Sequence, residues 1–170
     1  MVSKELESAI NKQINAEFWS AYLYLSMSAD FAAKGYPGFS NWMMVQFKEE
    51  QDHALKFFNY VIQRGGEVEL KPIEKVQQSW DKPLKAMEDT LAHEQKVTAL
   101  INGIYKIAHE ENDYATQSFL QWFIDEQVEE EDSARNLIDA LKRVGDKGPG
   151  AYMLDKELAS RVYVPLATAE

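Results

Sequence analysis

Apolar residues recur every three to four positions over most of the chain, which is the period of an amphipathic α-helix. The pattern predicts four long helices and a short fifth one, at about residues 4–34, 38–64, 83–111, 114–144 and 151–161. A Gly-Tyr-Pro-Gly break separates the first helix from the second, and an Asn-Asp break separates the third from the fourth. Each pair should therefore form an antiparallel hairpin, and we expect an all-α fold.

The two hairpins are joined by a long connection, residues 66–82. Its roughly 17 residues can reach about 50 Å when extended at about 3.3 Å per residue, which is enough to follow a whole helix. Antiparallel neighbours need only a short loop, whereas parallel helices need such a crossover. We therefore expect one domain, residues 1–170, built as a four-helix bundle in which the second and third helices run parallel, followed by the short fifth helix.

The apolar stripe of each long helix contains polar residues near its middle. In the first hairpin the inward positions are Ile10, Gln13, Glu17, Ser20, Tyr24, Met27 and Phe31, then Phe39, Met43, Gln46, Glu50, His53 and Phe57. In the second hairpin they are Leu84, Met87, Leu91, Glu94, Ile101 and Tyr105, then Leu120, Phe123, Gln127, Glu130, Ala134 and Leu137. The polar positions lie at similar distances from the hairpin turns, so they should meet at one depth in the bundle.

Six of these polar positions form two sets with identical internal spacing. The first set is Glu17, Glu50 and His53, and the second is Glu94, Gln127 and Glu130, each 77 positions further along the chain. In both sets a single glutamate is followed 33 residues later by a pair spaced three apart. Because residues three apart share one face of a helix, the spacing predicts a pocket with two-fold pseudosymmetry.

The chemistry of this pocket favours two metal ions. A buried carboxylate is costly unless it is paired or bound to metal, and four glutamates would share this interior with no lysine or arginine on the same stripes. Two divalent ions carry the four positive charges that balance them. Oxygen ligands with one imidazole and no thiolate suit iron. The alternative, that these glutamates face solvent, would require all of them to be rotated off otherwise apolar stripes.

Composition excludes several other classes of protein. The chain has no cysteine, so disulfides, iron–sulfur clusters and thiol nucleophiles are ruled out. Its formal net charge of -10 argues against binding to nucleic acid or acidic membranes, which requires clustered lysine and arginine. The least charged segment, residues 16–33, is interrupted by Glu17 and Asp30 and is too short to span a bilayer. The N-terminus lacks an apolar signal core, so we expect a cytoplasmic protein.

At these positions the chain resembles the ferritin-like di-iron carboxylate proteins, and among them the bacterial non-haem ferritins. The resemblance is carried by Glu17, by Glu49-Glu50-Gln51-Asp52-His53, by Glu94 and by Glu126-Gln127-Val128-Glu129-Glu130. The generic di-iron pattern has a second Glu-x-x-His, where this chain has Gln127-x-x-Glu130, a departure that ferritins share. The resemblance covers the whole chain and implies a ferritin-like four-helix bundle.

The resemblance also implies roles for single residues. Glu17, Glu50 and His53 would bind a first iron, and Glu50, Glu94 and Glu130 a second, with Glu50 bridging. Gln127 would lie beside the second iron. Tyr24 would lie next to the centre, either as a redox-active group or as a core tyrosine hydrogen-bonded to a ligand carboxylate.

A second acidic cluster lies beside the first in the sequence. By resemblance, Glu49, Glu126, Glu129 and Glu130 would form a third iron site. The alternative is a solvated run of charge, which is common on helices. His93 and His109 stand apart from both sets, and we assign them no function.

The resemblance implies iron storage with ferroxidase activity: Fe(II) is oxidised by O2 at two irons per subunit, and ferric mineral collects in a hollow 24-subunit homo-oligomer. Apolar residues on more than one face of the first helix, such as Phe18 and Tyr22, independently favour a subunit interface. No haem is expected, because Gln51 stands where a haem-binding methionine would follow the bridging glutamate. The alternatives are a di-iron oxygenase or peroxidase acting on another substrate, and a purely structural bundle.

Overall fold

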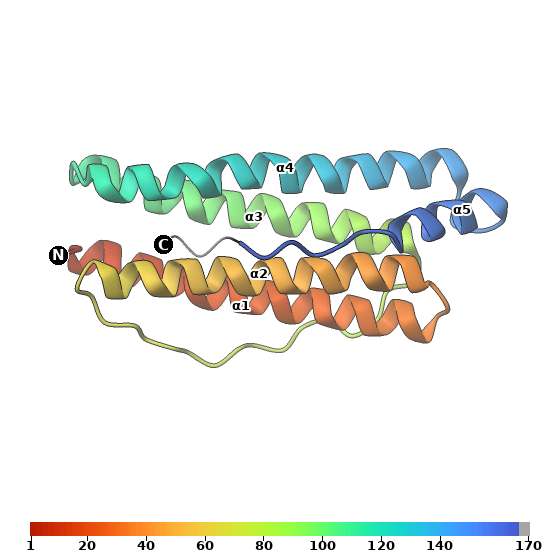
Figure 1. The fold of residues 1–170 in the computed structure, drawn as a ribbon, viewed down its shortest axis with the longest axis horizontal. Helices are drawn as coiled ribbons and strands as arrows, with labels where there is room; N and C mark the ends of the chain where they lie inside the picture. Colours follow the sequence, from red (N-terminus) through yellow and green to blue (C-terminus); the bar gives the residue numbers. More distant parts are fainter. Residues whose placement is uncertain (167–170) are drawn as a thin grey trace.

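The computed structural model describes residues 1–166; the last four residues of the predicted 1–170 domain lie outside the described residues. The elements are α1 (Lys4–Ala33), α2 (Pro37–Gln63), α3 (Pro83–Glu110), α4 (Tyr114–Val144) and α5 (Pro149–Leu158) (Figure 1). Residues 1–166 contain no β-strand, so the all-α prediction is confirmed. The fifth helix was predicted at 151–161, but α5 ends at Leu158, and Arg161 lies in the extended tail that follows it.

Local signals account for the helix ends. The Ser3 hydroxyl caps α1 by accepting a hydrogen bond from the Leu6 amide at 3.1 Å, and the Asp113 carboxylate caps α4 by accepting one from the Thr116 amide at 2.9 Å. Gly35 follows α1 with a φ of 80°, in the left-handed region where glycine is favoured. These signals account for the starts of α1 and α4 and for the end of α1.

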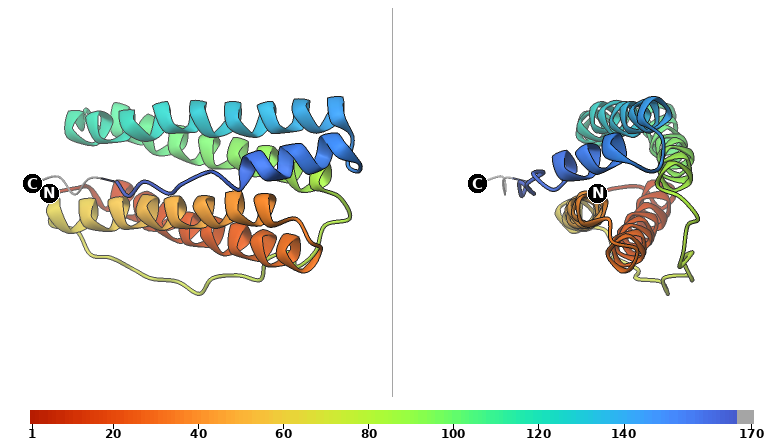
Figure 2. Two further views of the ribbon diagram at one scale, coloured as in Figure 1. Left: turned by 45° about the vertical axis from the view of Figure 1, so that its right-hand side comes forward. Right: turned by 90° about the vertical axis from the view of Figure 1, so that its right-hand side faces the viewer.

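The topology matches the prediction of two hairpins joined by a crossover. Figures 1 and 2 show α1 and α2 antiparallel, α3 and α4 antiparallel, and α2 parallel to α3. The crossover follows the length of α1: Asn11 donates to the Glu67 carbonyl at 2.9 Å, and Asp30 accepts from the Trp80 amide at 3.0 Å. No helix in the described part of the chain combines the length and apolar character needed to cross a membrane.

The core consists of two apolar clusters, one toward each end of the bundle. All thirteen inward positions predicted for α1 and α2 are buried. On α3 and α4 the pattern is slightly displaced, because Leu84, Leu91, Tyr105 and Leu137 are only half-buried while Ala86, Val97, Ile104 and Ile138 are buried. Between the two clusters lies a layer of buried polar side chains.

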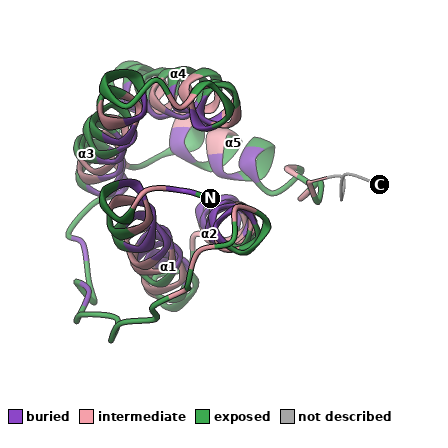
Figure 3. Ribbon diagram, turned by 90° about the vertical axis from the view of Figure 1, so that its left-hand side faces the viewer, coloured by how far each residue is buried: buried purple, intermediate pink, exposed green. Residues whose placement is uncertain are grey.

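Helix α5 lies between α4 and α2 (Figure 3), and its Asp155 contacts the first turn of α2. The N-cap residue of α2, Tyr36, makes no capping hydrogen bond with its side chain, and the buried carboxylate of Asp155 takes over this role. Its Oδ1 accepts from the amides of Gly38 and Phe39, both at 2.9 Å. A Cβ on Gly38 would lie 1.6 Å from the Asp155 carbonyl oxygen, so glycine is required for this approach.

We predict that Gly38→Ala lowers the free energy of unfolding by about 1–3 kcal/mol, because the added methyl group forces α5 away from α2. Gly103→Ala is the matched control: at this exposed position within α3 an added Cβ would have no atom within 4 Å, and alanine should stabilise the helix by about 0.5–1 kcal/mol. Urea unfolding followed by circular dichroism measures both. Equal shifts in the two variants would contradict the docking contact.

Candidate metal centre

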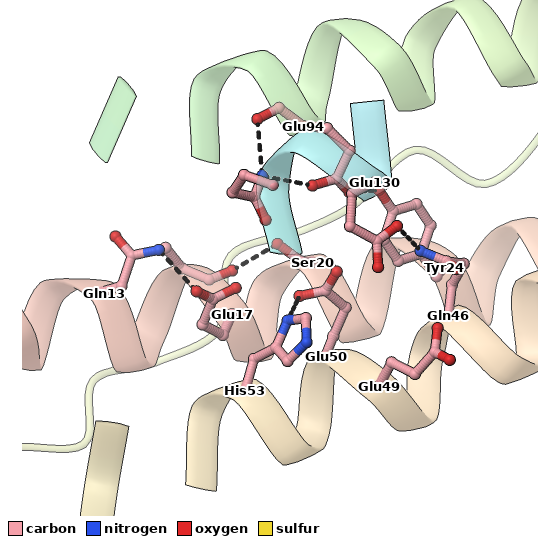
Figure 4. A network of polar contacts seen from close by, with 12 residues as sticks. Gln13, Glu17, Ser20, Tyr24, Gln46, Glu49, Glu50, His53, Glu94 and Glu130 are labelled. Atoms are coloured by element: carbon pink, nitrogen blue, oxygen red, sulfur yellow. Dashed lines mark hydrogen bonds and ion pairs between the residues drawn. The ribbon is translucent and has the colours of Figure 1, made fainter. Parts of the chain in front are cut away.

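The polar layer receives side chains from all four long helices. Figure 4 labels each of the residues that contribute them except Gln127. The contributing residues are Glu17 on α1, Glu50 and His53 on α2, Glu94 on α3, and Gln127 and Glu130 on α4. Each is at most 6% exposed. The six predicted positions thus lie in one interior, although they come from four separate stretches of sequence.

The first half of the centre is a compact group. Glu17, Glu50 and His53 each present a ligand atom within 4.8 Å of the other two, and no other set of three acidic, cysteine or histidine side chains in residues 1–166 comes as close. Glu50 Oε2 lies 3.4 Å from His53 Nδ1. Among the described residues, Glu17 Oε2 and Glu50 Oε2 are buried without a hydrogen-bond partner. Such oxygens are costly alone and suit a cation that accepts their lone pairs.

The second half is held by hydrogen bonds across helices. The Tyr24 hydroxyl donates to Glu94 Oε1, and Gln127 Nε2 donates to Glu94 Oε2 at 3.1 Å. Gln46 Nε2 donates to Glu130 Oε2 at 2.8 Å, which links α2 to α4. The carboxylates of this half are therefore oriented by neutral donors.

Glutamine amides recur around the centre. Gln13 Nε2 donates to Glu17 Oε1 at 2.8 Å, so that Gln13, Gln46 and Gln127 each hold one carboxylate. A neutral amide fixes the orientation of a carboxylate without cancelling its charge, which leaves that charge available to a metal ion. The sequence placed Gln13 and Gln46 on the inward stripes but gave them no role. Their one local signal is a position four residues before Glu17 and Glu50, respectively.

Burial also controls the protonation of the centre. Loss of water raises the pKa of Glu17 and of Glu50 well above the ordinary range, and repulsion between neighbouring carboxylates raises both further. The same two causes raise the pKa of Glu130 to about 8, and burial raises that of Glu94. Divalent cations that bind here must displace protons, so their affinity should increase with pH.

Aromatic rings enclose the centre. The His53 ring contacts Trp122 and Phe123 edge-on, at centroid distances of 5.4 and 6.0 Å. His93, to which the sequence assigned no function, lies 2.7 Å from the Ser20 hydroxyl through its Nε2, and burial lowers its pKa to about 4. His93 is therefore a neutral, hydrogen-bonded packing residue beside the centre. His109 is exposed near the end of α3.

The predicted second acidic cluster comprises Glu49 on α2, which is half-buried, and three residues of α4: Glu126 is half-buried, Glu129 is exposed and Glu130 is buried. Repulsion from Glu126 and Glu129 contributes to the raised pKa of Glu49, although burial is the largest cause. Glu49 is also paired with Arg161, whose Nη2 lies 2.7 Å from Glu49 Oε2. The sequence missed this arginine, because no motif marks it.

Comparison with known proteins places the fold and the sequence in one family. The model of the ferritin-like domain family matches residues 7–144. A bacterial non-heme ferritin of Bacteroides fragilis is 44% identical over 161 residues, covering 95% of this chain and 100% of that protein. One from Staphylococcus aureus is 39% identical over 163 residues, covering 96% and 98%.

Solved structures that resemble this chain are also ferritins. An open-pore ferritin from the hyperthermophilic archaeon Archaeoglobus fulgidus superposes with a TM-score of 0.94 at 46% identity, covering 95% of this chain and 100% of that one. A humanized archaeal ferritin superposes with a TM-score of 0.95 at 45% identity, covering 97% and 100%. Since the family match spans most of the chain and the relatives align over nearly its whole length, this chain belongs to the ferritin family.

Proposed function

We propose that this chain is the subunit of an iron store that oxidises Fe(II) with O2 and deposits ferric mineral inside a hollow shell. The observation that carries the proposal is the buried layer in which four glutamates and one histidine converge, with two carboxylate oxygens lacking a hydrogen-bond partner among the described residues. Membership of the ferritin family supports the same function over a di-iron oxygenase or peroxidase. We also propose a cytoplasmic location.

In this proposal iron is the substrate. Glu17, Glu50 and His53 hold one Fe(II), and Glu50, Glu94 and Glu130 hold the other. The two Fe(II) ions lose one electron each to one O2 molecule, which takes up two protons and leaves as hydrogen peroxide. Pairing the irons avoids the superoxide that a one-electron transfer from a single iron would yield.

Two further residues orient the second half of the centre. We propose that Tyr24 and Gln127 position Glu94 through the hydrogen bonds that they donate to its two oxygens. An electron-donating role for the Tyr24 ring is compatible with this geometry. Gln127 would also sit beside the second iron.

The shell requires surfaces that bind other subunits. Phe18 lines a surface hollow with Leu70 and Ile73 of the crossover, and these two side chains are 66% and 46% exposed. On α5, Tyr152 and Met153 are 62% and 66% exposed. Apolar area of this kind is typical of an interface. We propose a 24-subunit homo-oligomer in which α5 packs near a symmetry axis.

The second acidic cluster would act downstream of oxidation. We propose that Glu49, Glu126 and Glu129, together with Glu130, hold iron on its way from the paired site to the mineral. Because Glu130 belongs to both groups, a cation can move between them without crossing an apolar barrier.

We predict that Glu50→Ala and His53→Ala each slow the first rapid oxidation of Fe(II) by at least about tenfold, because each removes a ligand of the paired site. His109→Ala is the matched control, since this histidine is exposed and far along α3 from Glu94. Stopped-flow spectroscopy after anaerobic loading of two Fe(II) per subunit measures the rate. Parental rates in both ligand variants would refute the site.

We predict that the purified protein is a large closed particle and that the double change Leu70→Glu and Ile73→Glu shifts it to smaller species, because charge replaces apolar contact area. Lys106→Glu, which makes the same change in net charge at an exposed position of α3 outside this hollow, should leave the particle intact. Light scattering under dilute, metal-free conditions gives the size. A monomeric or dimeric parent would argue against storage and for the oxygenase alternative.

We predict that changing Glu49, Glu126 and Glu129 together to Gln leaves the first rapid oxidation of two irons in place, because the paired site keeps its ligands. The number of Fe(II) oxidised per O2 and the recovery of the site between additions should both change. Repeated stopped-flow additions measure the two quantities. If the triple variant matches the parent in both, the cluster is only a solvated run of charge.

A further inference from the structure

After a turn at residues 159–160 the chain returns along α2 as a tail, residues 161–166, drawn in dark blue beside α2 in Figures 1 and 2. Near the start of α2, Asn41 Nδ2 donates to the carbonyl of Arg161 at 2.9 Å. About one turn beyond Glu49, the hydroxyl of Tyr163 donates to Asp52 Oδ2 at 2.6 Å, and the amide of Leu166 donates to the same atom at 3.2 Å. The tail thus passes directly over the part of α2 that carries Glu49.

Arg161 is the tail residue that reaches this carboxylate. Its Nη2 donates to Glu49 Oε2 at 2.7 Å, and its Nη1 donates to the Trp42 carbonyl at 3.4 Å. The guanidinium carbon lies 4.6 Å from the centre of the Trp42 ring, in a cation–π contact. The side chain is therefore held by three contacts, with its charge directed at one oxygen of Glu49.

This contact bears on the second acidic cluster because a carboxylate oxygen engaged by a guanidinium at salt-bridge distance is not available to a metal ion. Repulsion from Glu126 and Glu129 reaches Glu49, so the arginine occupies one member of an acidic group that would otherwise attract a cation. Arg161 and a metal ion therefore compete for the same carboxylate.

The tail is also held weakly. After Leu158 none of the residues up to 166 is buried, and Val162 and Val164 are 76% and 74% exposed. Polar contacts between partly exposed groups contribute about 0–1 kcal/mol each. A segment without a buried apolar anchor opens at low free energy, so a divalent or trivalent cation can displace it.

We propose that Arg161 is a built-in competitor for the cation at Glu49, and that the C-terminal tail must lift away before Glu49 can bind metal. The tail then sets the affinity of the second acidic cluster for metal ions. Binding of a metal ion to this cluster releases the tail. This inference rests on the proposed function of that cluster, and it extends it by naming what occupies the site when metal is scarce.

The test uses Zn(II), which binds carboxylates and imidazole but takes no part in oxidation, so that binding is measured separately from ferroxidase activity. Arg161→Gln should tighten the third Zn(II) per subunit by about tenfold in calorimetric titration, since it removes one charge at contact distance near the surface. Arg161→Lys should retain most of the parental affinity. Arg143→Gln, on the exposed end of α4, is the control for an equal change in net charge.

Two outcomes of the titration would overturn the proposal. One is an unchanged third affinity, or no third Zn(II), in Arg161→Gln; the other is an equal gain in Arg143→Gln, which would indicate a general effect of charge. Adding Glu49→Gln should abolish the gain, because a neutral amide then replaces the carboxylate that attracts both Arg161 and the metal ion. If the third affinity responds as expected but the parent does not oxidise Fe(II), the ferroxidase function fails while the role of Arg161 stands.

A second measurement follows the tail itself. When Zn(II) exceeds two per subunit, hydrogen exchange in a peptide containing residues 159–166 should accelerate in the parent, because the Leu166 amide loses its bond to Asp52. In Glu49→Gln the same addition should change little. Equal acceleration in both proteins, or none in the parent, would show that metal and the tail do not compete.

Discussion

Four glutamate side chains share one water-poor layer of this bundle, and the cost of ionising them together is the constraint on which the rest of the structure depends. Burial raises the pKa of each, repulsion between carboxylates adds to the effect, and no lysine or arginine lies on the same inward stripes to offset it. The apolar clusters that pack on both sides of the layer supply favourable burial energy that offsets this cost, and divalent cations can supply the missing charge.

The surrounding residues are consistent with that requirement. Gln13, Gln46 and Gln127 bring neutral amides to the carboxylates, which fixes their orientation and preserves their charge. The two halves differ in a useful way, since Glu17 and Glu50 each keep a buried oxygen without a partner among the described residues, whereas Glu94 and Glu130 are hydrogen-bonded. The first half is the more open to a cation, and the second is the better ordered.

At the edge of the centre the charge of a carboxylate is balanced in a different way. Glu49 is only half-buried and is paired with Arg161, which comes from the far end of the chain. In our proposal protein charge and metal charge are alternatives at this position, whereas in the buried layer only metal or protons balance the carboxylates. A chain segment that opens easily suits the edge, and rigid helices suit the interior.

The sequence by itself determined the four long helices, their pairing, the parallel crossover and the six positions of the central layer. It could do so because helical periodicity is local, and because the spacing of Glu17, Glu50 and His53 repeats at Glu94, Gln127 and Glu130. The roles of these residues in binding iron remain predictions.

Only the tertiary structure decided which partners meet across large separations. Gln46 with Glu130, Asp155 with the first turn of α2, and Arg161 with Glu49 each join residues more than 80 positions apart. The early end of α5 at Leu158 belongs with them, because Asn41 of α2 binds the carbonyls of Leu158, Ala159 and Arg161. Such contacts depend on where whole helices lie, and neither periodicity nor composition carries that information.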